Sequence, residues 1–263
     1  KYFPRRNCRI KKYYRISIMS IWGKIIGGTA GFALGGPMGA IIGMMVGGSL
    51  DRTAKRFSTS KKIPPNQKQN IFALSVIILS AKIAKADGQV TEDEIYAFKE
   101  KFKISDAEMP QVGKIFNEAK KSTEGYKDIA NQVGLLFADN KILLEELLNN
   151  LFYIAESDGE TSTNEIKILE SISHSFGLSK NDFQRIFHSR LNNKNSDPYK
   201  VLGVTRDDDN SLIRKKWIFL CKEHHPDNLV SKGLPQDFID QANDELSSIN
   251  LAYDKIKDQR GIN

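Results

Sequence analysis

The chain has 263 residues, of which 40% are hydrophobic and 27% are charged. This composition is enough to bury one or two ordinary cores, which excludes a wholly disordered protein. The formal net charge is +7, but the basic N-terminal extension accounts for all of it, so a general nucleic-acid-binding role has no support in the rest of the chain. Only Cys8 and Cys221 occur, which excludes a disulfide framework and fits a reducing compartment.

Residues 1–18 form this basic extension. Its charged residues are Lys1, Arg5, Arg6, Arg9, Lys11, Lys12 and Arg15, and it contains no acid. Because Met19 is followed at once by an apolar segment, we expect residues 1–18 to be upstream sequence without a role in the working protein.

Residues 21–50 are expected to form a glycine-rich transmembrane helix. No charged residue occurs from Ile25 to Leu50, a stretch longer than the roughly 20 residues that a helix needs to cross a bilayer. Trp22 before the stretch and the basic residues after it are typical of membrane interfaces. Pro37 either kinks this helix or divides it into a re-entrant hairpin. A signal peptide or a flexible linker is the alternative interpretation of the segment.

Glycine recurs at every fourth position of this segment. The stripe consists of Gly27, Gly31, Gly35, Gly39, Gly43 and Gly47. Such a stripe lets a second helix approach closely, so we expect self-association in the membrane. The positive charges that follow the segment predict a single-pass protein whose C-terminal domains are cytoplasmic. Residues 51–66, with the Pro64-Pro65 pair, are expected to be a linker.

Residues 67–190 are expected to form a helical domain with an internal duplication. Apolar residues recur at helical spacing, and no alternating strand pattern is present. The sequence AKADGQVTEDEI at 84–95 is repeated as AESDGETSTNEI at 155–166. We therefore expect two related helical units to pack into one domain.

The duplicated loops have two interpretations. In one, their carboxylates bind a divalent cation such as calcium or magnesium. In the other, Gly88 and Gly159 end one helix, and capping boxes at residues 91–94 and 162–165 open the next. The pattern resembles the TerB-like domain of tellurite-resistance proteins, which implies a metal site at this position. The candidate ligands are then Asp87, Glu94, Asp158 and Glu165.

A polar linker at residues 191–196 leads to a C-terminal module at residues 197–259. Asp197 is expected to cap a short helix that begins with Pro198. A second helix is expected at about 209–223, with Ile213, Trp217, Leu220 and Cys221 as its buried stripe, and a third at about 236–259. Together, the two long helices would form an antiparallel hairpin.

The loop at the tip of this hairpin carries the sequence His225-Pro226-Asp227. Together with DPYKVLGV at 197–204 and NLAYDKI at 250–256, this tripeptide makes the module similar to the J-domain family. The resemblance implies that the tripeptide engages a DnaK-class ATPase chaperone. It also implies that an acidic face of this partner meets three basic residues, Arg214, Lys215 and Lys222.

Two residues depart from the J-domain pattern. Trp217 stands where a tyrosine is usual, and Asn228 follows the tripeptide where a lysine or arginine is common. We expect Trp217 to preserve the packing of the helix. The missing charge at Asn228 is expected to weaken docking of the partner.

The complete order of segments resembles the DjlA-type membrane J-proteins of bacteria. WGKIIG at 22–27 and HHPDNLVSKGLP at 224–235 carry this resemblance beyond the individual domains. It implies an all-α, non-enzymatic co-chaperone of the bacterial inner membrane, in contact with lipid and without a required cofactor. The alternative is a membrane-anchored stress or metal sensor that acts through the central domain.

Overall fold

The computed structural model describes residues 20–24, 39, 65–87, 92–121, 125–156, 161–190 and 196–262. Five glycines of the stripe, residues 51–64 and the side chains of Asp87, Glu94 and Asp158 lie outside this description, and the expectations placed on them stay predictions. Among the described helices, none combines the length and apolarity needed to cross a bilayer.

The described chain is all helical, as expected, and contains no strand. A short helix, α1 (Ile21–Lys24), precedes the central domain. The central domain consists of α3 (Pro65–Asp87), α4 (Glu92–Lys101), α5 (Met109–Lys121), α6 (Tyr126–Leu136), α7 (Lys141–Ala155), α8 (Thr163–Ser175) and α9 (Lys180–Arg190). The C-terminal module consists of α10 (Pro198–Leu202), α11 (Asn210–Glu223), α12 (Pro226–Lys232), the 3-10 helix η1 (Gln236–Phe238) and α13 (Ile239–Arg260).

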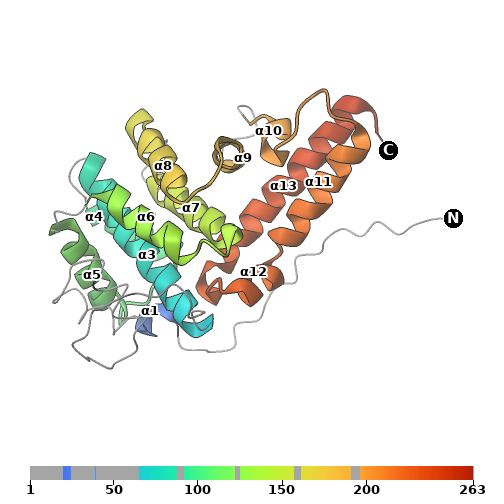
Figure 1. The fold of residues 1–263 in the computed structure, drawn as a ribbon. Coiled ribbons are helices and arrows are strands. Elements are labelled where there is room, and N and C mark those ends of the chain that lie inside the picture. The colour runs from blue at the N-terminus through green and yellow to red at the C-terminus, as the bar shows by residue number, and fades with distance from the viewer. Residues whose placement is uncertain are drawn as a thin grey trace.

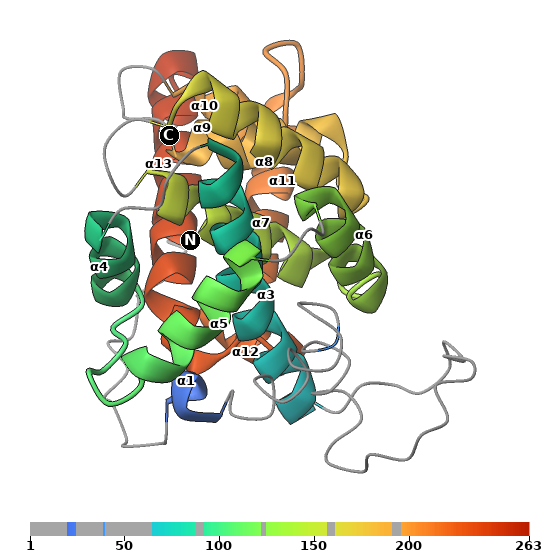
Figure 2. The same ribbon diagram turned by 90° about the vertical axis from the view of Figure 1, so that its left-hand side faces the viewer.

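Helix α3 runs through the middle of the central domain (Figures 1 and 2). Its residues from Ile71 to Ile83 are buried on every side, and α5, α6, α7 and α8 pack around it. A helix that is apolar on all its faces is stable only in such an interior position. Ser75 and Ser80 are buried with it, because each hydroxyl donates to a carbonyl of the preceding turn of α3.

The C-terminal module begins as the sequence predicts. The Asp197 carboxylate accepts a hydrogen bond from the Tyr199 amide, Pro198 follows at the first helical position, and Asp209 caps α11. Helices α11 and α13 lie side by side (Figure 1). Between them and α10 lies a small core of their own. Its buried members are Tyr199, Val201, Leu202, Ile213, Leu220, Ile249, Ala252 and Ile256.

The connection between α11 and α13 differs from the simple loop that we expected. It contains a helix, α12, and the turn η1. Its apolar side chains Leu229, Leu234 and Phe238 join the core of the central domain instead of the small core of the module, and so do Ile239 and Ala242 in the first turn of α13. Helix α12 contacts α7, while α10 and α13 contact α9. The two parts of the protein therefore share one core at the end of the module where the tripeptide lies.

Trp22 also belongs to this shared core. It has no exposed surface and packs against Phe98, Phe102 and Phe238. The structure thus buries Trp22 among protein side chains, and its expected place at a membrane interface stays a prediction. The three rings, from α4, from the residue that follows α4 and from η1, form an apolar site around the indole.

Candidate partner-binding site

The His225-Pro226-Asp227 tripeptide forms the start of α12. His225 is the N-cap residue, and its Nδ1 accepts a hydrogen bond of 3.2 Å from the Asp227 amide. Pro226 occupies the first helical position and is buried, which fixes the direction in which the helix leaves α11. The side chain of His225 is 36% exposed and that of Asp227 69%. Both polar side chains are thus presented to solvent by a rigid turn.

Two contacts fix α12 against the end of α11. The Asn228 side chain donates to the carbonyl of Glu223 at 2.8 Å, and Lys232 pairs with the carboxylate of Glu223 at 2.6 Å. Gly233 ends the helix with a φ of +110°, a backbone conformation that favours glycine. Asn228 therefore supplies a cap for α11 at the position where we noted a missing positive charge.

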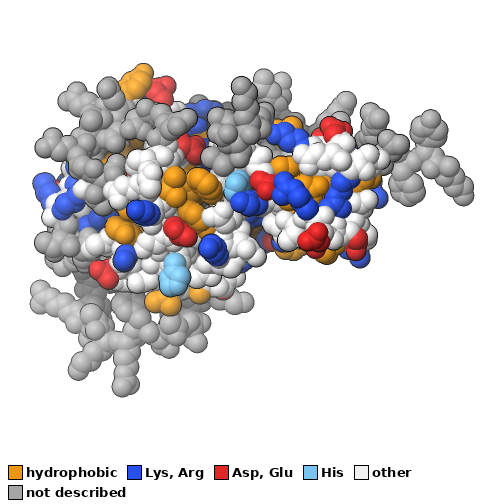
Figure 3. Space-filling model, turned by 90° about the horizontal axis from the view of Figure 1, so that it is seen from above, with side chains coloured by type: hydrophobic (Ala, Val, Ile, Leu, Met, Phe, Trp, Pro, Cys, Tyr) orange, Lys and Arg blue, Asp and Glu red, His pale blue; other side chains and the backbone are white. Residues whose placement is uncertain are grey.

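The basic residues that the sequence predicts lie on α11. All three are exposed. Arg214 and Lys215 lie in the second turn of α11, and Lys222 lies in its last turn, close to the tripeptide. Lys216 is half-buried instead, and burial, together with Arg185, lowers the pKa of its amine. On the face that Figure 3 shows, blue and red atoms lie interspersed rather than as a field of one sign. The three exposed cations are thus a local feature of α11.

Trp217 supports this helix from its inner side. Its ring stacks on Tyr253 of α13, with 4.2 Å between the ring centroids, and its Nε1 donates to Asn250 at 3.0 Å. The expectation that Trp217 preserves the packing is therefore confirmed. This stack packs against the small core and helps to hold α11 and α13 together.

A buried charge network joins the residue before the tripeptide to the central domain. The Nδ1 atom of His224 lies 2.9 Å from Glu146, and its Nε2 atom lies 3.4 Å from Glu145, both on α7. Arg185 of α9 bridges Glu145 at 2.5 Å and Glu245 of α13 at 2.8 Å. Four helices thus meet at charged groups that water hardly reaches.

The charge states of this network follow from its geometry. Burial and Arg185 oppose the charged form of His224, but the hydrogen bonds to Glu145 and Glu146 outweigh them and raise its pKa to about 9. Burial likewise opposes ionisation of Glu145, yet Arg185 and His224 lower its pKa to about 2. At neutral pH the network therefore holds a charged His224 beside the ionised carboxylate of Glu145.

Sequence reasoning missed this network. A signal was present in α7, where Glu145-Glu146 and Asn149-Asn150 interrupt an otherwise apolar helix. Polar pairs at such positions are buried and must find partners or lose solvation free energy. The partner His224 lies far along the chain, next to the tripeptide, and no spacing rule connects the two positions.

The structure describes one of the four candidate metal ligands in full. Glu165 closes a capping box, in which its carboxylate accepts from the Ser162 amide at 2.8 Å and its amide donates to the Ser162 hydroxyl at 3.1 Å. The capping interpretation is confirmed for this copy of the repeat. No group of three or more candidate metal-binding side chains occurs in the part of the chain that the structure describes. The cation site remains a prediction for Asp87, Glu94 and Asp158.

Three family models match the chain in consecutive segments. The co-chaperone DjlA transmembrane domain matches residues 19–63, the tellurite resistance protein TerB matches residues 73–188, and the DnaJ domain matches residues 197–261. The last of these contains the tripeptide and the basic residues of α11. No solved structure matches the chain.

Curated relatives match along nearly the whole chain. The co-chaperone protein DjlA of Coxiella burnetii is 29% identical over 91% of this chain and 98% of its own length. The DjlA proteins of Photorhabdus laumondii and Escherichia coli are 28% and 25% identical over 93% of this chain, and each is covered over its full length. With its three matched domains in one order, the chain belongs to the DjlA type of J-domain proteins.

Proposed function

We propose that this protein is a co-chaperone that stimulates ATP hydrolysis by a DnaK-class chaperone at the cytoplasmic face of the bacterial inner membrane. The observation that carries the proposal is the pair of exposed side chains, His225 and Asp227, on a turn fixed by the buried Pro226. The DnaJ match and the relatives named co-chaperones support it.

The arrangement supports a two-step encounter with the partner. Arg214, Lys215 and Lys222 are exposed cations that attract an acidic surface and raise the rate of encounter. The Asp227 side chain is 69% exposed, so a partner arginine can reach its carboxylate and form a charge-assisted hydrogen bond with it. His225 needs no rearrangement to bind, because its contact with the Asp227 amide already orients its ring. The chain itself supplies docking groups rather than a catalytic centre.

The glycine-rich segment supplies the membrane part of the proposal. The match to the DjlA transmembrane domain over residues 19–63 supports anchoring in the lipid bilayer. Self-association through the glycine stripe is proposed from the spacing of its residues alone. The sensor alternative rests on the candidate ligands of the central domain, and the side chain of Glu165, the one described, is engaged in capping.

The test is steady-state ATP hydrolysis by a DnaK-class chaperone, with and without the full chain in lipid nanodiscs. The wild-type chain is expected to increase the rate, and His225→Gln is expected to return it to the rate of the chaperone alone. His174→Gln is the matched control, because His174 is exposed on α8 of the central domain. It should stimulate as the wild type does.

Two results would contradict the proposal. One is a folded wild-type chain that leaves the ATPase rate unchanged. The other is a His225→Gln chain that stimulates as well as His174→Gln, since the tripeptide would then not be the docking element. In either case the next measurement is the binding of calcium or magnesium to the central domain, because the sensor alternative depends on it.

A further inference from the structure

Helix α11 carries exposed apolar side chains on its basic face. Six large hydrophobic side chains are exposed in the part of the chain that the structure describes, and three of them, Leu212, Ile218 and Phe219, lie on this helix. Ile218 is 50% exposed and Phe219 is 54% exposed. Single exposed hydrophobic residues are ordinary on a protein surface. Two large neighbours, here named the α11 pair, leave a continuous apolar patch in water.

The α11 pair belongs to neither core of the described structure. The inner side of α11 packs on α13 through the buried Ile213 and Leu220 and the partly buried Trp217. Ile218 and Phe219 are absent from the residues that form the two cores and from those that pack against them. The size and apolarity of the pair are therefore not explained by the stability of the fold.

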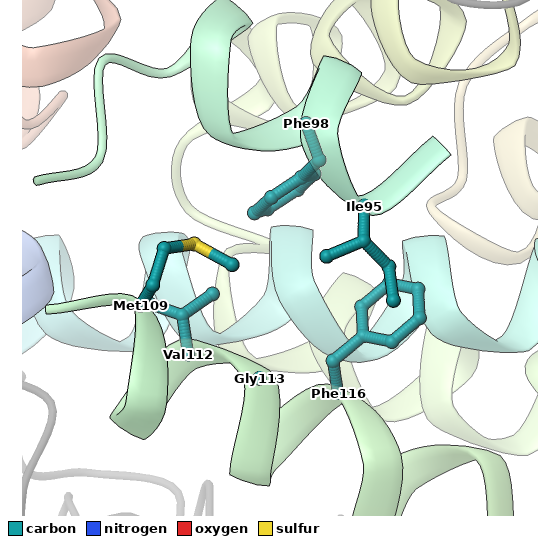
Figure 4. A pocket seen from close by; sticks show the side chains of 6 residues that line it. All are labelled: Ile95, Phe98, Met109, Val112, Gly113 and Phe116. Atoms are coloured by element: carbon teal, nitrogen blue, oxygen red, sulfur yellow. The ribbon is translucent and has the colours of Figure 1, made fainter. Parts of the chain in front are cut away.

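The apolar pocket between α4 and α5 is a useful contrast. Ile95 and Phe98 of α4 converge there on Met109, Val112 and Phe116 of α5 (Figure 4). The pocket has a volume of about 20 Å³, which leaves room for little more than one water molecule. Its side chains thus cover one another. The α11 pair has no such cover among the described residues.

Cations flank the α11 pair on both sides along the helix. Arg214 and Lys215 lie one turn before it, and Lys222 lies one turn after it. Residues three or four positions apart are neighbours on a helix surface, so the pair occupies the middle of the basic face. His225 follows Phe219 by six positions, so one partner surface can reach both the tripeptide and the pair.

Both side chains of the pair are restricted before any partner binds. The Nζ atom of Lys216 lies 5.5 Å from the centroid of the Phe219 ring, a distance at which a cation and an aromatic ring attract each other. Branching at Cβ limits the rotamers of Ile218. Little side-chain freedom is therefore lost on binding, which increases the affinity that a given contact provides.

We propose that Ile218 and Phe219 form the apolar centre of the surface with which α11 binds the DnaK-class chaperone, and that the partner offers an apolar patch bordered by carboxylates. The inference rests on the partner that the proposed function names. Large side chains at the centre of an interface carry most of the binding free energy, whereas charges at its rim mainly set the rate of encounter. The pair therefore slows dissociation, and the three cations speed association.

The test measures the two rate constants separately. The full chain in lipid nanodiscs is immobilised, and a DnaK-class chaperone with ATP is passed over it in a surface plasmon resonance experiment. Ile218→Ala combined with Phe219→Ala is expected to raise the dissociation rate constant about tenfold or more and to leave the association rate constant unchanged. Lys215→Ala is expected to lower the association rate constant instead, and only at low salt, because salt screens exposed charges.

Two controls accompany the double variant. Leu251→Ala removes a side chain that is 43% exposed on α13, and it should leave both rate constants unchanged. Circular dichroism melting of the double variant should match that of the wild type, because both side chains are exposed. The faster dissociation of the double variant should appear at low and at high salt, since salt does not screen the burial of apolar surface.

Three results would overturn the proposal. One is a dissociation rate constant of the double variant equal to that of Leu251→Ala. Another is a wild-type chain that does not bind the chaperone. The third is a double variant that binds the chaperone normally but sediments differently from the free wild-type chain, since a second copy of the chain would then cover the pair. Binding with the expected rate constants, but without a rise in ATP hydrolysis, would contradict only the proposed function.

Discussion

At the residue scale, Gly233 shows how closely the two domains approach each other. It combines a φ of +110° with a position where an added Cβ would lie 3.4 Å from the Lys68 side chain and 3.6 Å from that of Leu143. Both neighbours belong to the central domain, while Gly233 ends the helix that carries the tripeptide. A side chain at this position would strain the turn, and its Cβ would be in van der Waals contact with the central domain.

Gly233→Ala is therefore expected to lower the free energy of unfolding by about 1 to 3 kcal/mol, mainly through backbone strain. Gly261→Ala is the matched control, because Gly261 has a φ of +62° and no atom near the added Cβ. Denaturant unfolding of both variants in one detergent measures the difference. An equal loss at the two sites would show that the approach to Lys68 and Leu143 adds nothing.

His224 predicts a pH dependence of stability. In the folded chain its pKa is raised to about 9, whereas the ordinary value is 6.5. A group of this kind contributes its full stabilisation below about pH 6.5 and loses it as the pH rises toward 9. The unfolding free energy of the wild type should fall over this interval by roughly 3 kcal/mol more than that of His224→Gln. Parallel pH profiles for the two chains would show that His224 is not charged in the junction.

Glu145 sets the acid limit of the same network. Its pKa is lowered from 4.5 to about 2, so its contribution is present above about pH 4.5 and disappears as the pH falls through 2. The network is therefore most stabilising between the two ordinary values, in mildly acidic solution. Measurements of His224 are best begun near pH 6, where Glu145 is fully ionised.

At the element scale, α1 is short but contributes a large side chain to the shared core. Trp22→Ala is expected to lower the unfolding free energy by about 3 to 5 kcal/mol, because it empties a fully buried site. Trp22→Phe keeps a ring among Phe98, Phe102 and Phe238 and should lose clearly less. Thermal unfolding of the three chains in the same nanodiscs measures the order. If Trp22→Ala were as stable as the wild type, the burial of Trp22 in the shared core would be contradicted.

The helices that the sequence predicted best are those with a local signal at the N-terminal end. The start of α10 is predicted by Asp197 with Pro198, and the start of α11 by Asp209. The start of α8 is predicted by the capping box of Ser162 and Glu165. Each signal lies within one helical turn of the residues that it caps, so no knowledge of tertiary structure is needed. The HPD tripeptide is likewise local, and its place between α11 and α13 follows from its place in the chain.

The rest of the site depends on contacts between distant elements. Helix α12 was expected to be loop because its apolar residues are few, and it becomes a helix where Leu229 and Leu234 reach the central core. The sequence around His224 gives no sign that its ring contacts Glu145 and Glu146, because these residues lie far away in the chain, on α7. Trp22 has the sequence context of a membrane-interface residue, and the three rings around it come from α4, from the residue that follows α4 and from η1.

At the scale of the whole molecule, the C-terminal module is not an independent body. Its small core lies between α10, α11 and α13, but the half that carries the tripeptide is buried against α3, α4 and α7. An isolated fragment of residues 197–262 would expose Leu229, Leu234, Phe238 and their neighbours to water. The central domain thus supplies the support on which the docking turn is built.

We therefore expect the 197–262 fragment to unfold at a lower temperature than the module within the full chain, and to stimulate the partner ATPase less at equal concentration. Circular dichroism melting and the ATPase assay measure the two effects. As a control, Leu251→Ala changes an exposed residue of α13 and should affect neither property in the full chain. Equal activity of fragment and full chain would show that the tripeptide needs no support.

The shared core also has a consequence for synthesis on the ribosome. Ser20 and Asp237, which it brings together, are 217 positions apart in the sequence. At about 5 to 20 residues per second, translation needs roughly 10 to 40 seconds to pass from one to the other. From their own synthesis until the end of that interval, the rings of Phe72 and Phe102 lack the cover that Phe238 provides. The nascent chain thus exposes for several seconds the kind of apolar surface that general chaperones recognise, so this co-chaperone is expected to be a client of chaperones before it becomes their partner.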